Sequence, residues 1–166
     1  MPKETLDLRM MRAMRTRGHA PAIENAARAL GRLGNHGAIW AALGLLLALV
    51  DPSNREAWLI CAALGPLAIG LNYAVKLLVR RPRPVLEGLP PLGGAPSSLS
   101  FPSAHATSSF AVATAMTRVE PLGALAFLLA LALALGRPYL GMHYPSDVLA
   151  GAVIGVILGL LVPLSL

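Results

Sequence analysis

Long apolar runs, separated by short polar segments, dominate this sequence from residue 36 onward. They cover residues 36–50, 57–79, 104–117, 121–135 and 148–165. A helix needs about 20 apolar residues to cross a bilayer, and only helices or closed barrels satisfy their backbone groups there. The shorter runs would have to recruit the residues before them. The pattern predicts an all-α fold, a multi-span transmembrane helical bundle with about five spans.

The composition agrees with a membrane protein and argues against other classes. Hydrophobic residues make up 55% of the chain, charged residues only 13%, and the mean hydropathy is +0.63. Such values are rare in soluble domains. The net charge is +6, but the cations cluster beside apolar runs, as juxtamembrane anchors do. With only two Trp, three Tyr and three Phe, a base-stacking surface is poorly supported, so we expect no nucleic-acid partner.

Residues 1–35 differ from the rest because they are polar and basic. The methionines and Leu6 recur there at helical spacing beside several arginines, which is typical of an amphipathic helix on a membrane surface. A solvated, frayed tail is the alternative interpretation. A second helical stretch, residues 22–33, carries three charges that argue against spanning. We therefore expect a basic interfacial helical segment at 1–35 and a transmembrane domain at 36–166.

The distribution of cations predicts an orientation in the membrane. Cytoplasmic loops carry an excess of Lys and Arg. With the N-terminus in the cytoplasm, two cations, Arg55 and Arg118, fall outside, and nine fall inside even after Lys76, Arg83 and Arg137 are left out as suited to chemistry. We therefore expect a multi-pass protein of the cell membrane with its reactive polar segments facing the cytoplasm. An additional span before residue 36 would reverse this orientation.

Three short polar segments carry residues suited to phosphate chemistry, and all would lie at one membrane face. In the first, Lys76 ends an apolar run, and Arg83 follows just before Pro84. Arg presents a planar fork that matches phosphate oxygens, and Lys adds a compact charge. Taken alone, a cluster that anchors the end of a helix explains these cations better.

The second segment, Ser103-Ala104-His105, follows Pro102 and is typical of the start of a helix. The N–H groups at such a start bind anions, and the Ser103 hydroxyl could add a donor. His105 can donate a proton near neutral pH. Ordinary helix capping beside a solvated histidine is the alternative, and for this segment alone it is the better interpretation.

The third segment contains Arg137, Gly141, His143 and Asp147. His143 and Asp147 are four residues apart, so they can meet on one helical face, and Pro145 between them suits a helix start. A carboxylate that fixes one imidazole nitrogen leaves the other as a nucleophile or base. Arg137 supplies another phosphate clamp, and Gly141 allows a close backbone approach. An interfacial salt bridge explains this segment less well than a catalytic site does.

A metal site is the competing use of these side chains. His105, His143 and Asp147 could supply three ligands. The surrounding arginines would repel a cation, so an anion fits the segments better. Cys61, the only cysteine, lies inside an apolar run and offers neither a disulfide nor a cysteine metal site. We therefore expect no metal and no other cofactor.

Together the three segments resemble the tripartite signature of the type 2 phosphatidic acid phosphatase superfamily, which contains membrane lipid phosphatases and soluble vanadium haloperoxidases. The matching residues are Lys76 with Arg83-Pro84, then Pro102-Ser103-Ala104-His105, then Arg137, Gly141-Met142-His143 and Asp147. The resemblance implies a helical bundle and makes residues 36–166 a phosphatase domain. It also implies metal-independent hydrolysis of phosphate esters through a phosphohistidine.

The resemblance further implies a role for each residue. His143 is then the nucleophile, Asp147 its orienting partner, and His105 the acid that protonates the leaving alkoxide. The phosphate-binding groups are Lys76, Arg83, Arg137, Ser103 and the backbone N–H of Ala104. Two positions depart from the signature: Ala104 replaces a usual Gly, and Gly136 replaces a usual Ser. The second change removes a hydroxyl donor worth about 1 kcal/mol.

The apolar spans suggest that the leaving group is a lipid, so the expected partners are a lipid phosphate substrate and membrane lipids. Candidates are phosphatidic acid, phosphatidylglycerophosphate, a polyprenyl diphosphate and a polyprenyl-phosphoryl sugar phosphate. In its high content of Ala, Gly and Arg, the sequence is similar to actinobacterial decaprenylphosphoryl-5-phosphoribose phosphatases of cell-wall synthesis. A vanadate-dependent peroxidase would share the site but is soluble, and a non-catalytic lipid-binding module would not need the two histidines. The sequence does not predict the oligomeric state.

Overall fold

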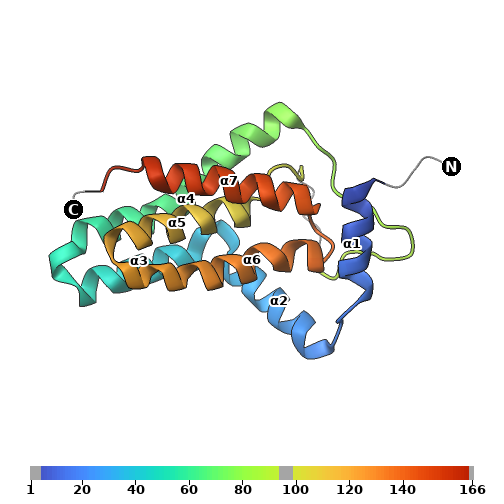
Figure 1. The fold of residues 1–166 in the computed structure, drawn as a ribbon, viewed down its shortest axis with the longest axis horizontal. Helices are drawn as coiled ribbons and strands as arrows, with labels where there is room; N and C mark the ends of the chain where they lie inside the picture. The colour runs from blue at the N-terminus through green and yellow to red at the C-terminus, as the bar shows by residue number, and fades with distance from the viewer. Residues whose placement is uncertain (1–4, 94–98, 165–166) are drawn as a thin grey trace.

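The fold is a bundle of α-helices with a further helix across one end (Figure 1). The computed structural model describes residues 5–93 and 99–164. Within these ranges it contains α-helices and short 3₁₀ turns but no strand. The helices are α1 (Leu6–Thr16), α2 (Pro21–Leu33), α3 (Ala38–Val50), α4 (Arg55–Val79), α5 (Ala104–Val119), α6 (Ala126–Tyr139) and α7 (Pro145–Leu161). The 3₁₀ turns are Asn35–Gly37, Pro52–Asn54 and Pro121–Leu125.

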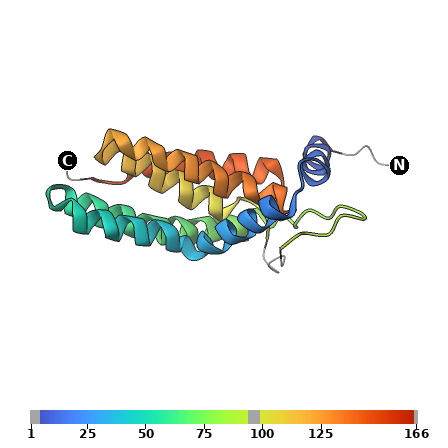
Figure 2. The ribbon, with the colours of Figure 1, turned by 90° about the horizontal axis from the view of Figure 1, so that it is seen from below.

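Helix α5 lies at the centre of the bundle, against α4, α6 and α7 (Figure 2). Ten of its sixteen residues are buried and none is exposed, and most of its side chains are Ala, Ser or Thr. Helix α7 presents Gly151, Gly155 and Gly159 to it, and a Cβ at Gly155 would lie 2.5 Å from the carbonyl oxygen of Thr107. Small residues on both helices let the two backbones approach closely. The expected tight packing of residues 104–117 inside a bundle is therefore confirmed.

The five apolar runs correspond to α3 through α7, but the number of membrane spans is not confirmed as about five. Among the residues that the structure describes, two helical segments, Pro52–Val79 and Pro121–Tyr139, are long and apolar enough to cross a bilayer. A third span arises if α2 and α3, which meet at a 55° bend, count as one. Helix α7 is apolar but shorter than a span normally requires. Exposed leucines such as Leu46, Leu71 and Leu128 form an apolar outer surface suited to lipid.

The N-terminal segment forms helices rather than a frayed tail. Helix α1 crosses the end of the bundle beside α6 and α7 (Figure 1). Its Met11 and Arg15 are buried, while Leu6 and Met10 are exposed. Helix α2 packs against α6. The predicted helices are thus confirmed, and α1 also contacts the bundle.

The segment between α4 and α5 is irregular wherever the structure describes it, as its Pro, Gly and Ser content predicts. Residues 94–98 of this expected loop lie outside the described residues. Its two ends are joined, because Ser100 donates its N–H to the Arg81 carbonyl at 2.9 Å and its hydroxyl to the Pro82 carbonyl at 2.9 Å. The end of α4, the start of α5, the end of α6 and the start of α7 therefore meet beside this loop.

Candidate active site

His143 and Asp147 form the centre of the site. Both are buried, with 3% and 0% of their side chains exposed. Nδ1 of His143 lies 3.5 Å from Oδ2 of Asp147, and that oxygen also accepts the Tyr144 N–H at 2.9 Å. The local sequence explains the position of Asp147, because Pro145 begins α7 and an acidic residue in the first turn caps its N–H groups.

Arg83 fixes the tautomer of His143. Its Nη1 lies 3.3 Å from Nε2 of His143 and donates to the Met142 carbonyl at 2.6 Å. A guanidinium has no acceptor, so the ring nitrogen that faces it must carry the lone pair. Nδ1 then carries the proton, directed at Asp147. The ring therefore presents an unprotonated Nε2 to the cations, as a nucleophile for phosphorus requires.

The other two predicted clamp cations lie close to the same ring. Lys76, Arg83 and Arg137 all interact electrostatically with His143. Lys76 is 6% exposed and donates to the carbonyls of Leu99 at 2.7 Å and Ser100 at 3.3 Å, so it also holds the loop. Arg137 is likewise 6% exposed, and its Nε has no hydrogen-bond partner among the described residues.

His105 contacts helix α2 as well as the site. It interacts electrostatically with Arg137, His143 and Arg83, which places it beside the other site residues. Its Nε2 lies 2.9 Å from the carbonyl oxygen of Gly31. A carbonyl only accepts, so Nε2 carries the proton in this arrangement. This contact could not be foreseen, because nothing in the sequence relates residue 31 to residue 105.

The start of α5 supplies the remaining predicted groups. Ser103 is buried, and its hydroxyl caps the helix by accepting the Ala106 N–H at 3.5 Å. The Ser103 N–H donates to the Asp147 carbonyl at 2.9 Å, which ties this helix start to α7. Ala104 begins the helix, where backbone N–H groups have no intrahelical partner. Its backbone is helical and not left-handed, so Ala in place of Gly is tolerated there.

Arg81 holds Asp147 from the side opposite His143, a role that the sequence did not reveal. Its Nη1 donates to Oδ1 of Asp147 at 2.8 Å and to the Ser146 hydroxyl at 2.7 Å, and its Nη2 donates to Asp7 at 2.9 Å. Asp7 also accepts the Ser146 N–H at 3.1 Å. The guanidinium of Arg81 lies 3.9 Å from the centre of the Tyr144 ring. Helix α1 is thereby connected to the catalytic carboxylate.

A second contact joins α1 to the turn before His143. Arg15 donates to the Pro90 carbonyl at 2.7 Å. Gly141 has φ +81°, and a Cβ there would lie 3.1 Å from Nε of Arg15 and 3.3 Å from Cα of Pro91. The expected close backbone approach at Gly141 is confirmed, with Arg15 and the loop as its partners. At Gly136 a Cβ would meet no atom within 4 Å, so a Ser side chain would fit.

The electrostatics of the site keep His143 neutral. Burial lowers the pKa of His143 to about 4, and Arg83, Arg137 and Lys76 contribute, although the contact with Asp147 opposes them. Burial also lowers the pKa of Arg83. For Asp7, burial alone would raise the pKa, but hydrogen bonds from Arg81 and Ser146 lower it below its usual value. The site thus combines three cations with one neutral imidazole, an arrangement suited to an anion.

The alternative of a metal site gains no support from the side-chain positions. Across residues 5–93 and 99–164, no three His, Cys, Asp or Glu side chains gather into a group that could hold a metal ion. His143 and Asp147 face cations on their other sides. The arrangement can bind a phosphate group, attack phosphorus with Nε2 of His143 and exchange a proton through His105.

Comparison with known proteins points to the same family as the three polar segments do. The model of the PAP2 superfamily matches residues 56–166, a stretch that contains all three polar segments. A decaprenylphosphoryl-5-phosphoribose phosphatase of Mycolicibacterium smegmatis is 42% identical over 131 residues, covering 79% of this chain and 72% of that protein. One of Mycobacterium tuberculosis is 41% identical over 142 residues, covering 86% of this chain and 80% of that protein.

More distant relatives extend the comparison. The undecaprenyl-diphosphatase BcrC of Bacillus subtilis is 32% identical over 113 residues, covering 67% of this chain and 58% of that protein. The crystal structure of Aquifex aeolicus LpxE matches with a TM-score of 0.73 and 26% identity, covering 95% of this chain and 94% of that chain. The apolar outer surface and these relatives mark the chain as a membrane protein. By the family match over most of its length and by its mycobacterial relatives, the chain belongs to the PAP2 superfamily.

Proposed function

We propose that this protein is an integral membrane lipid phosphatase that works through a phosphohistidine on His143. The observation that carries the proposal is the orientation of the His143 ring. Its Nε2 faces Arg83 at 3.3 Å with the lone pair available, and its Nδ1 faces Asp147. The family and the names of the relatives support the class of reaction. No metal is needed for this chemistry.

In the proposed first step, Nε2 of His143 attacks phosphorus in line with the leaving oxygen. The N–P bond forms, the P–O bond to the lipid alcohol breaks, and His105 gives that oxygen a proton. Lys76, Arg83, Arg137 and the free N–H groups at the start of α5 stabilise charge on the other phosphate oxygens. His105 enters this step as the imidazolium and leaves it as the neutral imidazole, and for the transfer its Nε2–H must leave the Gly31 carbonyl or the ring must rotate.

In the second step, His105 takes a proton from water as the water oxygen attacks phosphorus. The N–P bond breaks, inorganic phosphate leaves, and His143 is restored with its proton still on Nδ1. Asp147 stabilises the imidazole while it carries the phosphoryl group.

For the substrate, we propose a polyprenyl-phosphoryl pentose phosphate, from which the enzyme removes the terminal phosphomonoester. The names of the mycobacterial relatives support this choice. A polyprenyl diphosphate is the second candidate, supported by the name of the Bacillus subtilis relative. Phosphatidylglycerophosphate and phosphatidic acid belong in the same comparison as controls with glycerolipid leaving groups.

We further propose that residues 1–35 lie at the cytoplasmic interface, that residues 36–166 cross the membrane several times, and that the site faces the cytoplasm. The cations on α1 and α2 lie at the same end of the bundle as the site, and Arg118 lies toward the other end, where it caps α7. Membrane-impermeant thiol labelling of Arg9→Cys and Arg55→Cys in intact cells, with Cys61 replaced by Ala, tests this, and we expect labelling at position 55 only. Labelling of position 9 from outside intact cells would overturn the orientation.

The central test is phosphate release from a panel of the lipid phosphates named above, in the presence of EDTA. We expect release to persist with EDTA, to stop with vanadate and to be lost in His143→Ala while the protein remains folded. Normal release by His143→Ala would refute the phosphohistidine. Binding of the lipids with no release by the wild type would favour a non-catalytic lipid-binding module.

A further inference from the structure

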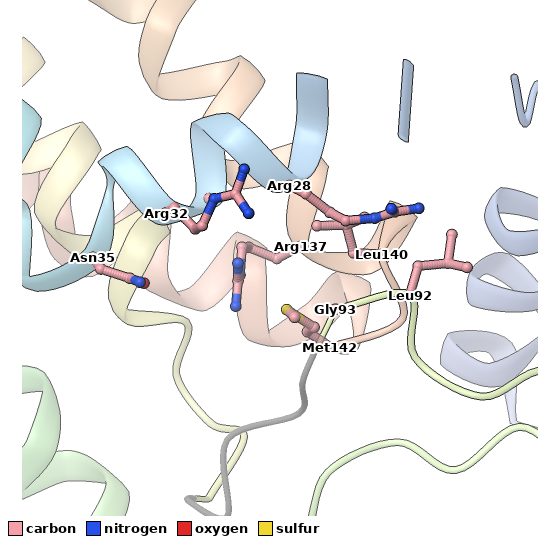
Figure 3. A pocket seen from close by; sticks show the side chains of 9 residues that line it. Arg28, Arg32, Asn35, Leu92, Gly93, Arg137, Leu140 and Met142 are labelled. Carbon is pink, nitrogen blue, oxygen red and sulfur yellow. The ribbon is translucent and has the colours of Figure 1, made fainter. Parts of the chain in front are cut away.

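A second cationic pocket lies beside the candidate active site. It has a volume of about 360 Å³, within the range of small-molecule sites, and it opens between α2, the loop at Leu92–Gly93 and the end of α6. Figure 3 shows the side chains of Arg28 and Arg32 from α2 and Arg137 from α6 around it. Asn35 adds an amide at one edge. None of the roles assigned to the signature residues uses Arg28, Arg32 or Asn35.

The charges in this pocket are not balanced by the residues that line it. Its described lining contains three arginines and no acidic side chain. Arg28 is partly neutralised, because Glu24 accepts from its Nη2 at 2.6 Å. Arg32 is exposed and forms no hydrogen bond or ion pair with any part of the chain that the structure describes. Arg137 is 6% exposed and keeps an unpartnered Nε. A buried guanidinium without a counter-charge, such as that of Arg137, is unfavourable in free energy. The arrangement therefore favours an anionic ligand.

The pocket shares Arg137 with the candidate site and is joined to it through Met142. Arg137 lines it and also interacts with His105 and His143. Met142 lines it too, while its carbonyl accepts from Arg83 and the next residue is His143. Helix α2 lies directly against Arg137, because a Cβ at Gly31 would be 3.0 Å from its Nη1. A ligand with one phosphate at His143 would therefore place its neighbouring groups in this pocket.

We infer that the pocket binds a second phosphate group of the substrate, so that Arg32, with Arg28 and Asn35, selects lipids carrying two phosphates separated by a sugar. This inference rests on the proposed phosphatase function. Guanidinium groups pair with phosphate oxygens in a planar, bidentate manner, whereas a neutral sugar or a lipid tail would leave them uncompensated. A diphosphate has its two groups adjacent, within reach of one set of clamps, and would not need a separate pocket on α2.

The test compares two synthetic lipids with the full-length protein in detergent. The first is farnesyl-phosphoryl-ribose 5-phosphate, and the second is the same molecule with its bridging phosphodiester methylated and therefore uncharged. Both carry the same scissile phosphomonoester. We expect the wild type to prefer the charged lipid in kcat/KM, and Arg32→Gln to lower that preference about tenfold, mainly through KM. Arg9→Gln, an exposed cation on α1, is the matched control and should keep the wild-type preference.

The outcomes separate the inference from the function on which it rests. Release from both lipids with no preference in the wild type would overturn the second-phosphate pocket and leave the phosphatase standing. An unchanged preference in Arg32→Gln and in the double variant Arg28→Gln/Arg32→Gln would do the same. Lack of release from either lipid would instead overturn the proposed phosphatase, and the inference with it.

Discussion

Replacing Asp7 with Asn should impair catalysis although Asp7 is far from every signature residue in the sequence. Asp7 accepts hydrogen bonds from Arg81 and Ser146, and Arg81 donates from its other nitrogen to Asp147. The carboxylate therefore fixes the guanidinium that holds the partner of His143. Asn keeps the shape, but it removes the charge and turns one acceptor into a donor that faces other donors.

The size of the effect follows from the bonds lost. A hydrogen bond between charged groups contributes about 1.5–3 kcal/mol, and the lower end applies because this pair is only partly buried. A change of about 1.4 kcal/mol corresponds to a factor of ten. If the loss is transmitted to the orientation of His143, kcat should fall about tenfold. KM should change little, because Asp7 contacts none of the phosphate-binding groups.

The assay is steady-state phosphate release by purified protein, normalised to the folded fraction. Asp51→Asn is the matched control, because Asp51 accepts from Trp58 at 2.9 Å and Asn54 at 2.9 Å near the end of the bundle away from the site. That variant should lose stability while keeping its kcat. In a double-mutant cycle, Asp7→Asn and Arg81→Gln should be less than additive. Full activity of Asp7→Asn, or strictly additive losses, would refute the connection through Arg81.

Three further predictions follow from burial and close packing. Because the pKa of His143 is lowered from 6.5 to about 4, the folded state resists its protonation, and this residue reduces stability as the pH falls between those values. Replacement by Asn should therefore flatten the pH dependence of the unfolding free energy in that window, and an unchanged slope would contradict this. Gly34→Ala should reduce kcat, because its Cβ would lie 2.8 Å from Cδ2 of His105, while Gly70→Ala, with no atom within 4 Å, should not. Gly155→Ala should lower the unfolding free energy by about 1–3 kcal/mol in a denaturation assay, since its Cβ would overlap the Thr107 carbonyl.

Local patterns were sufficient to predict the helices, and the tripartite signature named side chains that the structure brings together at the candidate site. Hydrophobic runs located α3 to α7. The spacing of His143 and Asp147 predicted that the two side chains meet, and they lie 3.5 Å apart, but only Asp147 belongs to α7, because His143 lies in the turn before Pro145. The number of spans could not be predicted in the same way. Composition identifies apolar helices, but α3 and α7 are too short for crossing to follow from length alone.

The contacts of α1 and α2 could not be predicted because they join residues that are distant in the sequence. Asp7 and Ser146 are separated by 139 positions, and His105 and Gly31 by 74. Arg81 looked like one more anchoring cation beside Arg80, and only its tertiary partners distinguish it. An acidic residue in an otherwise basic amphipathic helix was the one available signal, and Asp7 is that residue.

The glycine row on α7 has a mechanical consequence. Gly151, Gly155 and Gly159 seat the helix against α5 along most of its length, and the Ser103–Asp147 backbone bond closes the seam at the end that bears the reactive groups. Such close packing opposes sliding of one helix along the other, so α5 and α7 should move together as a rigid body when the surrounding bilayer thins or thickens. The separation between the proton donor on one helix and the carboxylate on the other would then stay constant while the lipid-facing helices adjust.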